Sequence, residues 1–95
     1  MIDKIKELIR MNKKILEENY KVKRLGVFGS YLIGENKRNS DIDILVEFSE
    51  TPDIFEFIRL EEFLSNLLGI KVDLVTRKAL KTLIRDNILK ETVYI

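Results

Sequence analysis

The order of apolar and polar residues predicts helices and strands that alternate along the chain. Residues 3–18 carry apolar side chains at helical spacing, which predicts one amphipathic helix that closes near Tyr20. The residues expected near its apolar face are Ile5, Leu8, Ile9, Ile15 and Leu16. Three short apolar runs predict strands at residues 22–28, 41–48 and 70–75.

The second predicted strand has two different faces, because its side chains alternate. One face carries Ile42, Ile44, Val46 and Phe48. The other face carries Asp41, Asp43, Leu45 and Glu47. We therefore expect the first face to pack in the core. The second face is expected to be solvent-exposed and functional where it begins, at Asp41 and Asp43.

Helices are expected after the second and third strands. Thr51 is predicted to cap a helix that ends at Leu68, with Gly69 as its stop. Thr76 is predicted to cap a last helix over residues 77–85, and a short final strand follows at 93–95. This order predicts a small sheet covered by helices.

Composition limits the chemistry that is available. The chain has 95 residues, 45% of them hydrophobic, which is enough for one domain with one modest core. It contains no Cys and no His, which excludes disulfides, thiolate zinc sites, cysteine nucleophiles and His-based triads. Any catalysis must therefore use carboxylates, hydroxyls, Lys, Arg or backbone groups, and such oxygen donors suit hard cations.

Charge and hydropathy limit which classes of partner, such as nucleic acids or membranes, the sequence favours. Lys and Arg number 17 against 16 Asp and Glu, so the net charge of +1 gives no strong nucleic-acid signal. No apolar run approaches membrane-spanning length, and the N-terminal residues mix charges into the apolar positions, unlike a signal peptide. We expect a cytoplasmic protein without a membrane partner.

A Gly-Ser pair follows the first predicted strand. Gly29 allows close approach of the backbone, and Ser30 opens a short predicted helix whose free N–H groups and hydroxyl suit the β and γ phosphates of a nucleotide. Taken alone, the pair is a weak signal and is more typical of a turn glycine followed by a serine helix cap.

Three aspartates are expected to lie near this turn. Asp41 and Asp43 are two residues apart on one strand, so their carboxylates project to the same face. If the third strand neighbours the second, Asp73 shares that face, and the three acids suit a site for two Mg²⁺ ions. The alternatives are a solvated strand end for the first two and an edge-strand acid that opposes aggregation for Asp73.

The combined pattern is more specific than its parts. The chain reads Gly29-Ser30-Tyr31-Leu32-Ile33-Gly34-Glu35, then Lys37-Arg38, then Ser40-Asp41-Ile42-Asp43, and later Lys71-Val72-Asp73-Leu74-Val75. It resembles the minimal nucleotidyltransferase (MNT) family, of the polymerase-β-like nucleotidyltransferases, over nearly all of its length. One departure is clear, because Leu32-Ile33 stands where the family commonly has Ala-Arg. Lys37, Arg38 or Arg77 are candidates to supply the missing charge.

The resemblance implies a fold and an activity. The fold would be α+β, a small mixed sheet flanked by helices in the order α-β-α-β-α-β-α, within a single nucleotidyltransferase domain over residues 1–95. The reaction would be Mg²⁺-dependent transfer of AMP from ATP to a hydroxyl. Gly29 and Ser30 would bind the nucleotide, and Asp41, Asp43 and Asp73 would be catalytic and hold two Mg²⁺ ions.

The resemblance also implies a partner, since family members of this size pair with a HEPN-domain toxin and transfer AMP to one of its tyrosines. Two alternatives stay open: an antitoxin that acts by binding alone, and nucleotidyl transfer to a small molecule or an RNA end. Phe55, Phe57 and Phe63 on one predicted helix, and the apolar residues 93–95, fit either a partner surface or the core. Homo-oligomerisation stays open as well.

Overall fold

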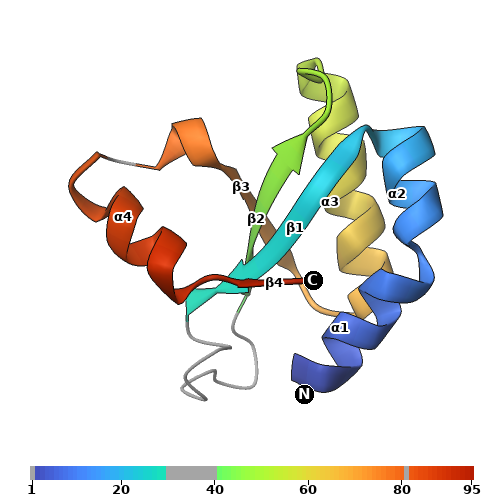
Figure 1. The fold of residues 1–95 in the computed structure, drawn as a ribbon. Coiled ribbons are helices and arrows are strands. Elements are labelled where there is room, and N and C mark those ends of the chain that lie inside the picture. The colour runs from blue at the N-terminus through green and yellow to red at the C-terminus, as the bar shows by residue number, and fades with distance from the viewer. Residues whose placement is uncertain (1, 30–40, 81) are drawn as a thin grey trace.

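The structure, a computed structural model, describes residues 2–29, 41–80 and 82–95 (Figure 1). The predicted short helix from Ser30 and the polar loop that follows it lie outside these ranges. The elements are α1 (Ile2–Met11), α2 (Lys13–Tyr20), β1 (Val22–Phe28), β2 (Ile42–Phe48), α3 (Ile54–Leu68), β3 (Val72–Thr76), the 3₁₀ helix η2 (Arg77–Ala79), α4 (Thr82–Glu91) and β4 (Val93–Tyr94).

The four strands form one mixed sheet in the order β3-β2-β1-β4. β1 runs antiparallel to both β2 and β4, whereas β2 and β3 are parallel. Helices α1, α2 and α3 cover one face, and α4 lies on the other side (Figure 1). This architecture confirms the predicted α+β class with a mixed sheet. In the described ranges, no helix has both the length and the apolar character needed to cross a membrane.

The main core lies between the sheet and helices α1 to α3. As predicted, Ile42, Ile44 and Val46 of β2 contribute to it and are at most 1% exposed. The other buried members are Ile5, Ile9, Leu16, Val22, Leu25, Val27, Leu60, Leu64, Val72 and Leu74. The alternation along β2 therefore identified the core face correctly.

The single helix predicted over residues 3–18 is wrong, because the structure breaks it at Asn12. The Asn12 side chain donates to the carbonyl of Leu8 at 2.8 Å, and its backbone N–H donates to the carbonyl of Ile9 at 3.1 Å. Such local bonds compete with the helical ladder. The break changes the helical phase, and Ile15, predicted to share the apolar face, is 41% exposed.

The cap of α3 also differs from the prediction. Asp53, rather than Thr51, is the N-cap: its carboxylate accepts from the N–H of Glu56 at 2.8 Å, and the Glu56 carboxylate accepts from the Asp53 N–H at 3.1 Å. This reciprocal pair is a capping box. The predicted end is confirmed, since α3 stops at Leu68 and Gly69 has φ 67°.

The last predicted helix starts later than expected. Thr76 accepts a hydrogen bond from the Ala79 N–H at 3.2 Å, but it caps only the short η2. Leu80 is extended, with φ −72° and ψ 134°, and α4 runs on to Glu91. The extended residue ends the first helical turn, and its side chain is buried against the sheet instead.

Side chains of α3 cover the outer edge of β3. The N–H of Val72 donates to Ser65 Oγ and that of Leu74 donates to Glu61 Oε2, both at 3.0 Å. These bonds satisfy backbone groups that an edge strand would otherwise leave free to pair with another chain. They also fix the strand that carries Asp73.

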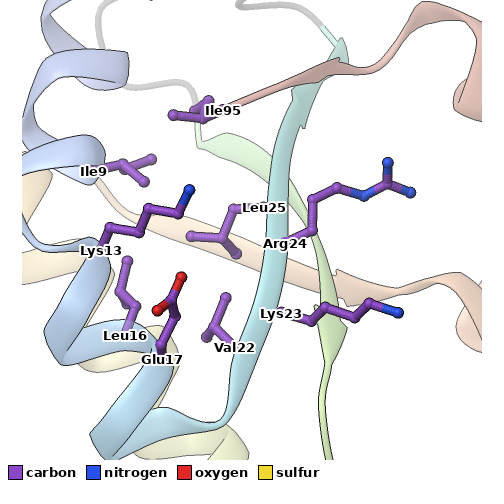
Figure 2. Close-up of a pocket in the computed structure, with 9 residues that line it drawn as sticks. All are labelled: Ile9, Lys13, Leu16, Glu17, Val22, Lys23, Arg24, Leu25 and Ile95. Carbon is purple, nitrogen blue, oxygen red and sulfur yellow. The ribbon is translucent and has the colours of Figure 1, made fainter.

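The C-terminal residues complete the sheet on its other edge. β4 pairs with Gly26 and Val27 of β1, and the Ile95 N–H donates to the Leu25 carbonyl at 2.9 Å. The Ile95 side chain points toward Ile9 and Leu25 beside the helices (Figure 2). The apolar tail therefore packs within the fold, as one of the two sequence interpretations expected.

We predict that Asp53→Ala lowers the free energy of unfolding by about 1 kcal/mol, because it removes the carboxylate that accepts from the Glu56 N–H and so breaks the reciprocal capping box. For a domain of this size, that loss lowers Tm by about 4–8 °C. The control is Thr51→Ala, which we expect to change stability by less than about 0.5 kcal/mol. Thermal unfolding followed by circular dichroism measures both. A larger loss for Thr51→Ala than for Asp53→Ala would contradict the cap.

Candidate active site

The parallel pairing of β2 and β3 brings two of the predicted acids together. Asp43 and Asp73 are register partners, so their Cα atoms lie one strand spacing apart, about 4.8 Å. Both side chains are on the face opposite the main core, because their neighbours Ile42, Ile44, Val72 and Leu74 are buried in that core. The predicted neighbourhood of Asp43 and Asp73 is therefore observed.

Gly29 lies directly against the Asp43 carboxylate. β1 ends at Phe28, which is the register partner of Asp43, and Gly29 follows with φ 81°. A Cβ at Gly29 would overlap Oδ2 of Asp43. The turn therefore needs glycine for its backbone conformation and for its close approach to the acid. The backbone of this turn and a carboxylate therefore meet at this end of the sheet.

The electrostatics of the site disfavour an ionised Asp43. Its pKa is raised above the usual value, first by burial and then by the negative charges of Asp73 and Asp41. Asp41 directly precedes β2, and its carboxylate lies 3.8 Å from the ammonium of Lys71. A bound cation would therefore favour the ionised form of Asp43.

In the described part of the chain, no three acidic side chains stand close enough together to hold a metal ion. The structure thus brings Asp43 and Asp73 into one row and places Asp41 within electrostatic reach. It does not gather all three carboxylates around one point. The donors present are oxygen atoms of carboxylates, which Mg²⁺ prefers, and the glycine leaves room beside Asp43. In their donor chemistry, the residues therefore suit magnesium.

A small apolar cluster packs beside the acids on the same face. Phe28, Leu45 and Leu80 are each at most 8% exposed, and Val75, Ile88, Leu89 and Tyr94 pack against them. Leu45 follows Asp43 by two residues, so this face changes from partly solvent-accessible at Asp43 to buried at Leu45. The cluster connects the segment before α4 to the end of β1 that leads into Gly29.

Several predicted site residues cannot be compared with the structure. Ser30, Tyr31 and the departure at Leu32-Ile33 lie outside the described residues, as do Lys37 and Arg38.

Arg77 lies at the far end of β3 from the acids. It comes four residues after Asp73, a strand distance of about 13 Å. The backbone geometry therefore does not favour Arg77 as the replacement for the missing phosphate-binding charge.

Sequence reasoning missed Arg85 in this region. Its Nη2 donates to the Leu80 carbonyl at 3.0 Å, and its Nε is buried without a hydrogen-bond partner among the described residues. The signal would have been a cation in the first turn of a helix, where the dipole disfavours it. The predicted helix over 77–85 concealed that signal, because it placed Arg85 in a last turn.

Comparison with known proteins identifies the family. The sequence profile described as Nucleotidyltransferase domain matches residues 9–95. The chain belongs to this family. Protein adenylyltransferase MntA of Thermococcus cleftensis is 47% identical over 94 residues, which cover 99% of this chain and 95% of the relative.

Two solved structures have the same fold. A toxin–antitoxin structure with AMP-PNP has a TM-score of 0.68 and 32% identity, over 97% of this chain and 69% of the other. A structure of a tri-AMPylated Shewanella oneidensis HEPN toxin in complex with MNT antitoxin has a TM-score of 0.66 and 25% identity. The match covers 95% of this chain and 70% of the other. The predicted resemblance to the MNT family and the predicted nucleotidyltransferase fold are therefore confirmed.

We predict that Asp43→Asn stabilises the metal-free protein at pH 7. A carboxyl whose pKa is raised by folding binds more protons in the folded state, so its contribution to stability falls as pH rises from its unfolded to its folded pKa. The amide removes this unfavourable charge. After allowance for solvent exposure, we expect a gain of roughly 0.5 kcal/mol, or about 2–4 °C in Tm.

The measurement is thermal unfolding between pH 4 and pH 8, with and without Mg²⁺. The difference between variant and wild type should shrink as pH falls through the raised pKa of Asp43. Mg²⁺ should raise the Tm of the wild type and not that of Asp43→Asn. An equal Mg²⁺ response in both proteins would contradict the assignment of Asp43 to a cation site.

Proposed function

We propose that this protein is a Mg²⁺-dependent protein adenylyltransferase. It transfers AMP from ATP to a tyrosine hydroxyl of a HEPN-type toxin, within a single nucleotidyltransferase domain over residues 1–95 and in the cytoplasm. The observation that carries the proposal is the contact of Gly29 with the Asp43 carboxylate, with Asp73 as its register partner. The related adenylyltransferase MntA and the AMPylated toxin complex supply the reaction and the partner.

Each site residue has a role in this reaction. Gly29 and Ser30 bind the triphosphate through backbone N–H groups and the hydroxyl. Asp41, Asp43 and Asp73 hold the cations, and Asp73, which is exposed, is also placed to accept the proton of the attacking hydroxyl. Bound Mg²⁺ would neutralise charge on the phosphates. An ester forms between the tyrosine oxygen and the α-phosphorus while the bond to the β-phosphate oxygen breaks, and pyrophosphate leaves.

The chosen nucleotide and cations rest on donor chemistry. AMP-PNP, an analogue of ATP, is present in one of the similar toxin–antitoxin structures. The site offers carboxylate oxygens and no nitrogen or sulfur ligand, since the chain has neither His nor Cys. Such a donor set favours Mg²⁺ over transition metals.

The second candidate function is neutralisation of the toxin by binding alone. The observation that favours it is Leu32-Ile33, which stands where the family that the sequence resembles commonly has Ala-Arg. The register of β2 and β3 argues against it, because it sets the acids 43 and 73 side by side, where they repel each other and where a bound cation would relieve that repulsion. We therefore favour catalysis.

We expect that Asp43→Ala abolishes transfer of label from α-³²P-ATP to the toxin in the presence of Mg²⁺. The loss should be at least about 100-fold, since the cation site supplies several kcal/mol of charge stabilisation. The acceptor is the product of the adjacent reading frame, separated by gel electrophoresis and mapped by mass spectrometry. Asp3→Ala, which removes an exposed acid of α1, is the matched control and should keep full activity.

Two outcomes would overturn the proposal. Neutralisation of the toxin by Asp43→Ala, with no label transferred by the wild type, would establish binding alone. Label found on a small molecule or an RNA end, and not on the toxin, would establish a different acceptor.

A further inference from the structure

A groove lies toward the opposite end of the strands that carry the acids. This groove, of about 850 Å³, is bounded by the carboxyl ends of β2 and β3, the segment 49–53, the start of α3, and η2. None of the three aspartates lines it, and apart from Leu74 and Val75, which follow Asp73 directly, its lining lies three or more residues beyond Asp43 and Asp73. The groove is therefore separate from the candidate active site.

Exposed apolar side chains lie on the first turns of α3 beside the groove. Ile54, Phe55 and Ile58 are 64%, 71% and 43% exposed, and Ile54 lines the groove itself. By contrast, Phe57 and Phe63 pack on the main core, where they contact Phe48 and Tyr20. Of the three phenylalanines considered for a partner surface, Phe55 alone faces solvent. Such adjacent apolar exposure is typical of protein-binding surfaces.

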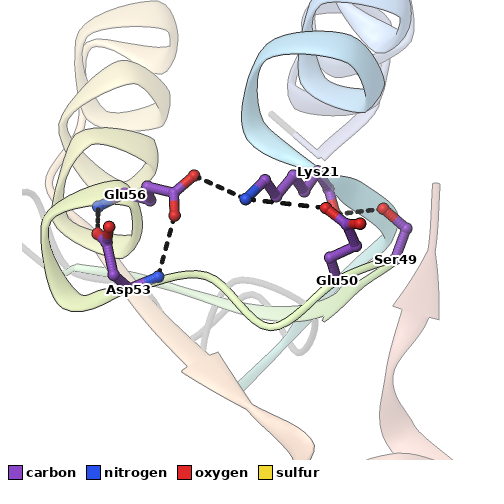
Figure 3. A network of polar contacts seen from close by, with 5 residues as sticks. All are labelled: Lys21, Ser49, Glu50, Asp53 and Glu56. Atoms are coloured by element: carbon purple, nitrogen blue, oxygen red, sulfur yellow. Dashed lines mark hydrogen bonds and ion pairs between the residues drawn. The ribbon is translucent and has the colours of Figure 1, made fainter.

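The acidic side chains at this groove are already engaged within the chain. The ammonium of Lys21 lies 3.1 Å from Glu56 and 3.8 Å from Glu50, and Asp53 is tied into the capping box (Figure 3). Glu47 pairs with Arg24. These contacts fix the acidic lip of the groove, where Glu47 and Glu50 each lie beside a cation of the chain.

The other lip is cationic. Arg77 and Lys78 of η2 line the groove and are exposed, and neither forms an ion pair with any residue in the described ranges. The groove thus combines an apolar floor and rim with two cations on η2 that form no ion pair within these ranges. A matching occupant carries apolar residues on one face and acidic residues beside them.

We propose that the groove and the start of α3 bind an acidic amphipathic segment of the same protein that the chain adenylylates. This inference rests on the proposed function, because it takes the acceptor protein as the occupant. A second copy of this chain is a poorer match. In a two-fold contact the same patch meets itself, and the acids of this patch are already engaged within their own chain instead of being free to pair with the cationic lip of the other copy. The groove holds the partner while the acids act at the other end of the strands.

The test uses Phe55→Glu, with Met11→Glu as its matched control. Met11 of α1 is 74% exposed, close to the 71% of Phe55, and does not line the groove. Binding of the full-length toxin is measured by isothermal titration calorimetry without ATP, in an Asp43→Ala background. We expect at least a tenfold rise in Kd for Phe55→Glu and less than a twofold change for Met11→Glu. Circular dichroism confirms that both variants fold.

A charge variant tests the cationic lip separately. Lys78→Glu should weaken toxin binding about fivefold at low salt, and the loss should shrink as salt screens the charges. Lys14→Glu, which reverses an exposed charge on α2, should leave Kd unchanged. In kinetic assays with the active protein, Phe55→Glu and Lys78→Glu should raise KM for the toxin and leave kcat and the Kd for AMP-PNP unchanged.

Because binding is read without catalysis, this inference and the proposed function can fail independently. Loss of label transfer with intact groove-dependent binding would refute the reaction only. Unchanged toxin binding in Phe55→Glu and Lys78→Glu would refute the groove as its docking site. Sedimentation that shows a dimer of this chain, dissociated by Phe55→Glu while toxin binding persists, would assign the groove to a second copy and overturn the proposal.

Discussion

The repulsion between Asp43 and Asp73 is the constraint on which the rest of the structure depends. The two acids are held as register partners only because the residues on either side of them are buried in the main core. Each such buried side chain stabilises the fold by roughly 1.5–3 kcal/mol. A slip of β3 by one residue would reverse its faces, burying Asp73 and exposing Val72 and Leu74. The hydrophobic pattern on one face thus fixes the charge arrangement on the other.

The second face of the sheet is divided along the strands. The acids and Gly29 lie at one end, and the apolar cluster around Leu45 follows. Next comes the ion pair of Arg24 and Glu47. The Arg24 guanidinium stacks on the Tyr94 ring, 3.8 Å from its centroid. The groove lies beyond, at the carboxyl ends of the same two strands. Because β2 and β3 are continuous between the two regions, their separation is fixed by strand geometry and does not depend on a hinge.

The sequence allowed prediction of features whose pattern is local and periodic. The bounds of β1, the core face of β2, the end of α3 at Gly69 and the shared neighbourhood of Asp43 and Asp73 all followed from spacing, turn residues and a motif. Features that depend on competing local hydrogen bonds did not. Asn12 interrupts a good helical pattern, and Asp53 displaces Thr51 as a cap because Glu56 completes its capping box.

The site was only partly predictable for a related reason. Burial and the summed charges of neighbours raise the pKa of Asp43, and the position of Arg85 in the first turn of α4 depends on the extended Leu80. Both are properties of tertiary packing. No sequence motif predicts the groove either, because it is formed by segments that meet only when β2 and β3 are side by side.

Lys21 shows how one strained residue is retained. It ends α2 in the left-handed conformation, with φ 58° and ψ 28°, which costs a residue other than glycine about 1 kcal/mol. Glycine would relieve that strain but lose the ammonium that bridges Glu50 and Glu56. The Lys21 carbonyl also accepts from the backbone N–H and the hydroxyl of Ser49, at 2.8 and 3.1 Å. The backbone conformation thus favours glycine at this position, whereas the ion pairs favour lysine. We therefore expect few other amino acids to be tolerated there.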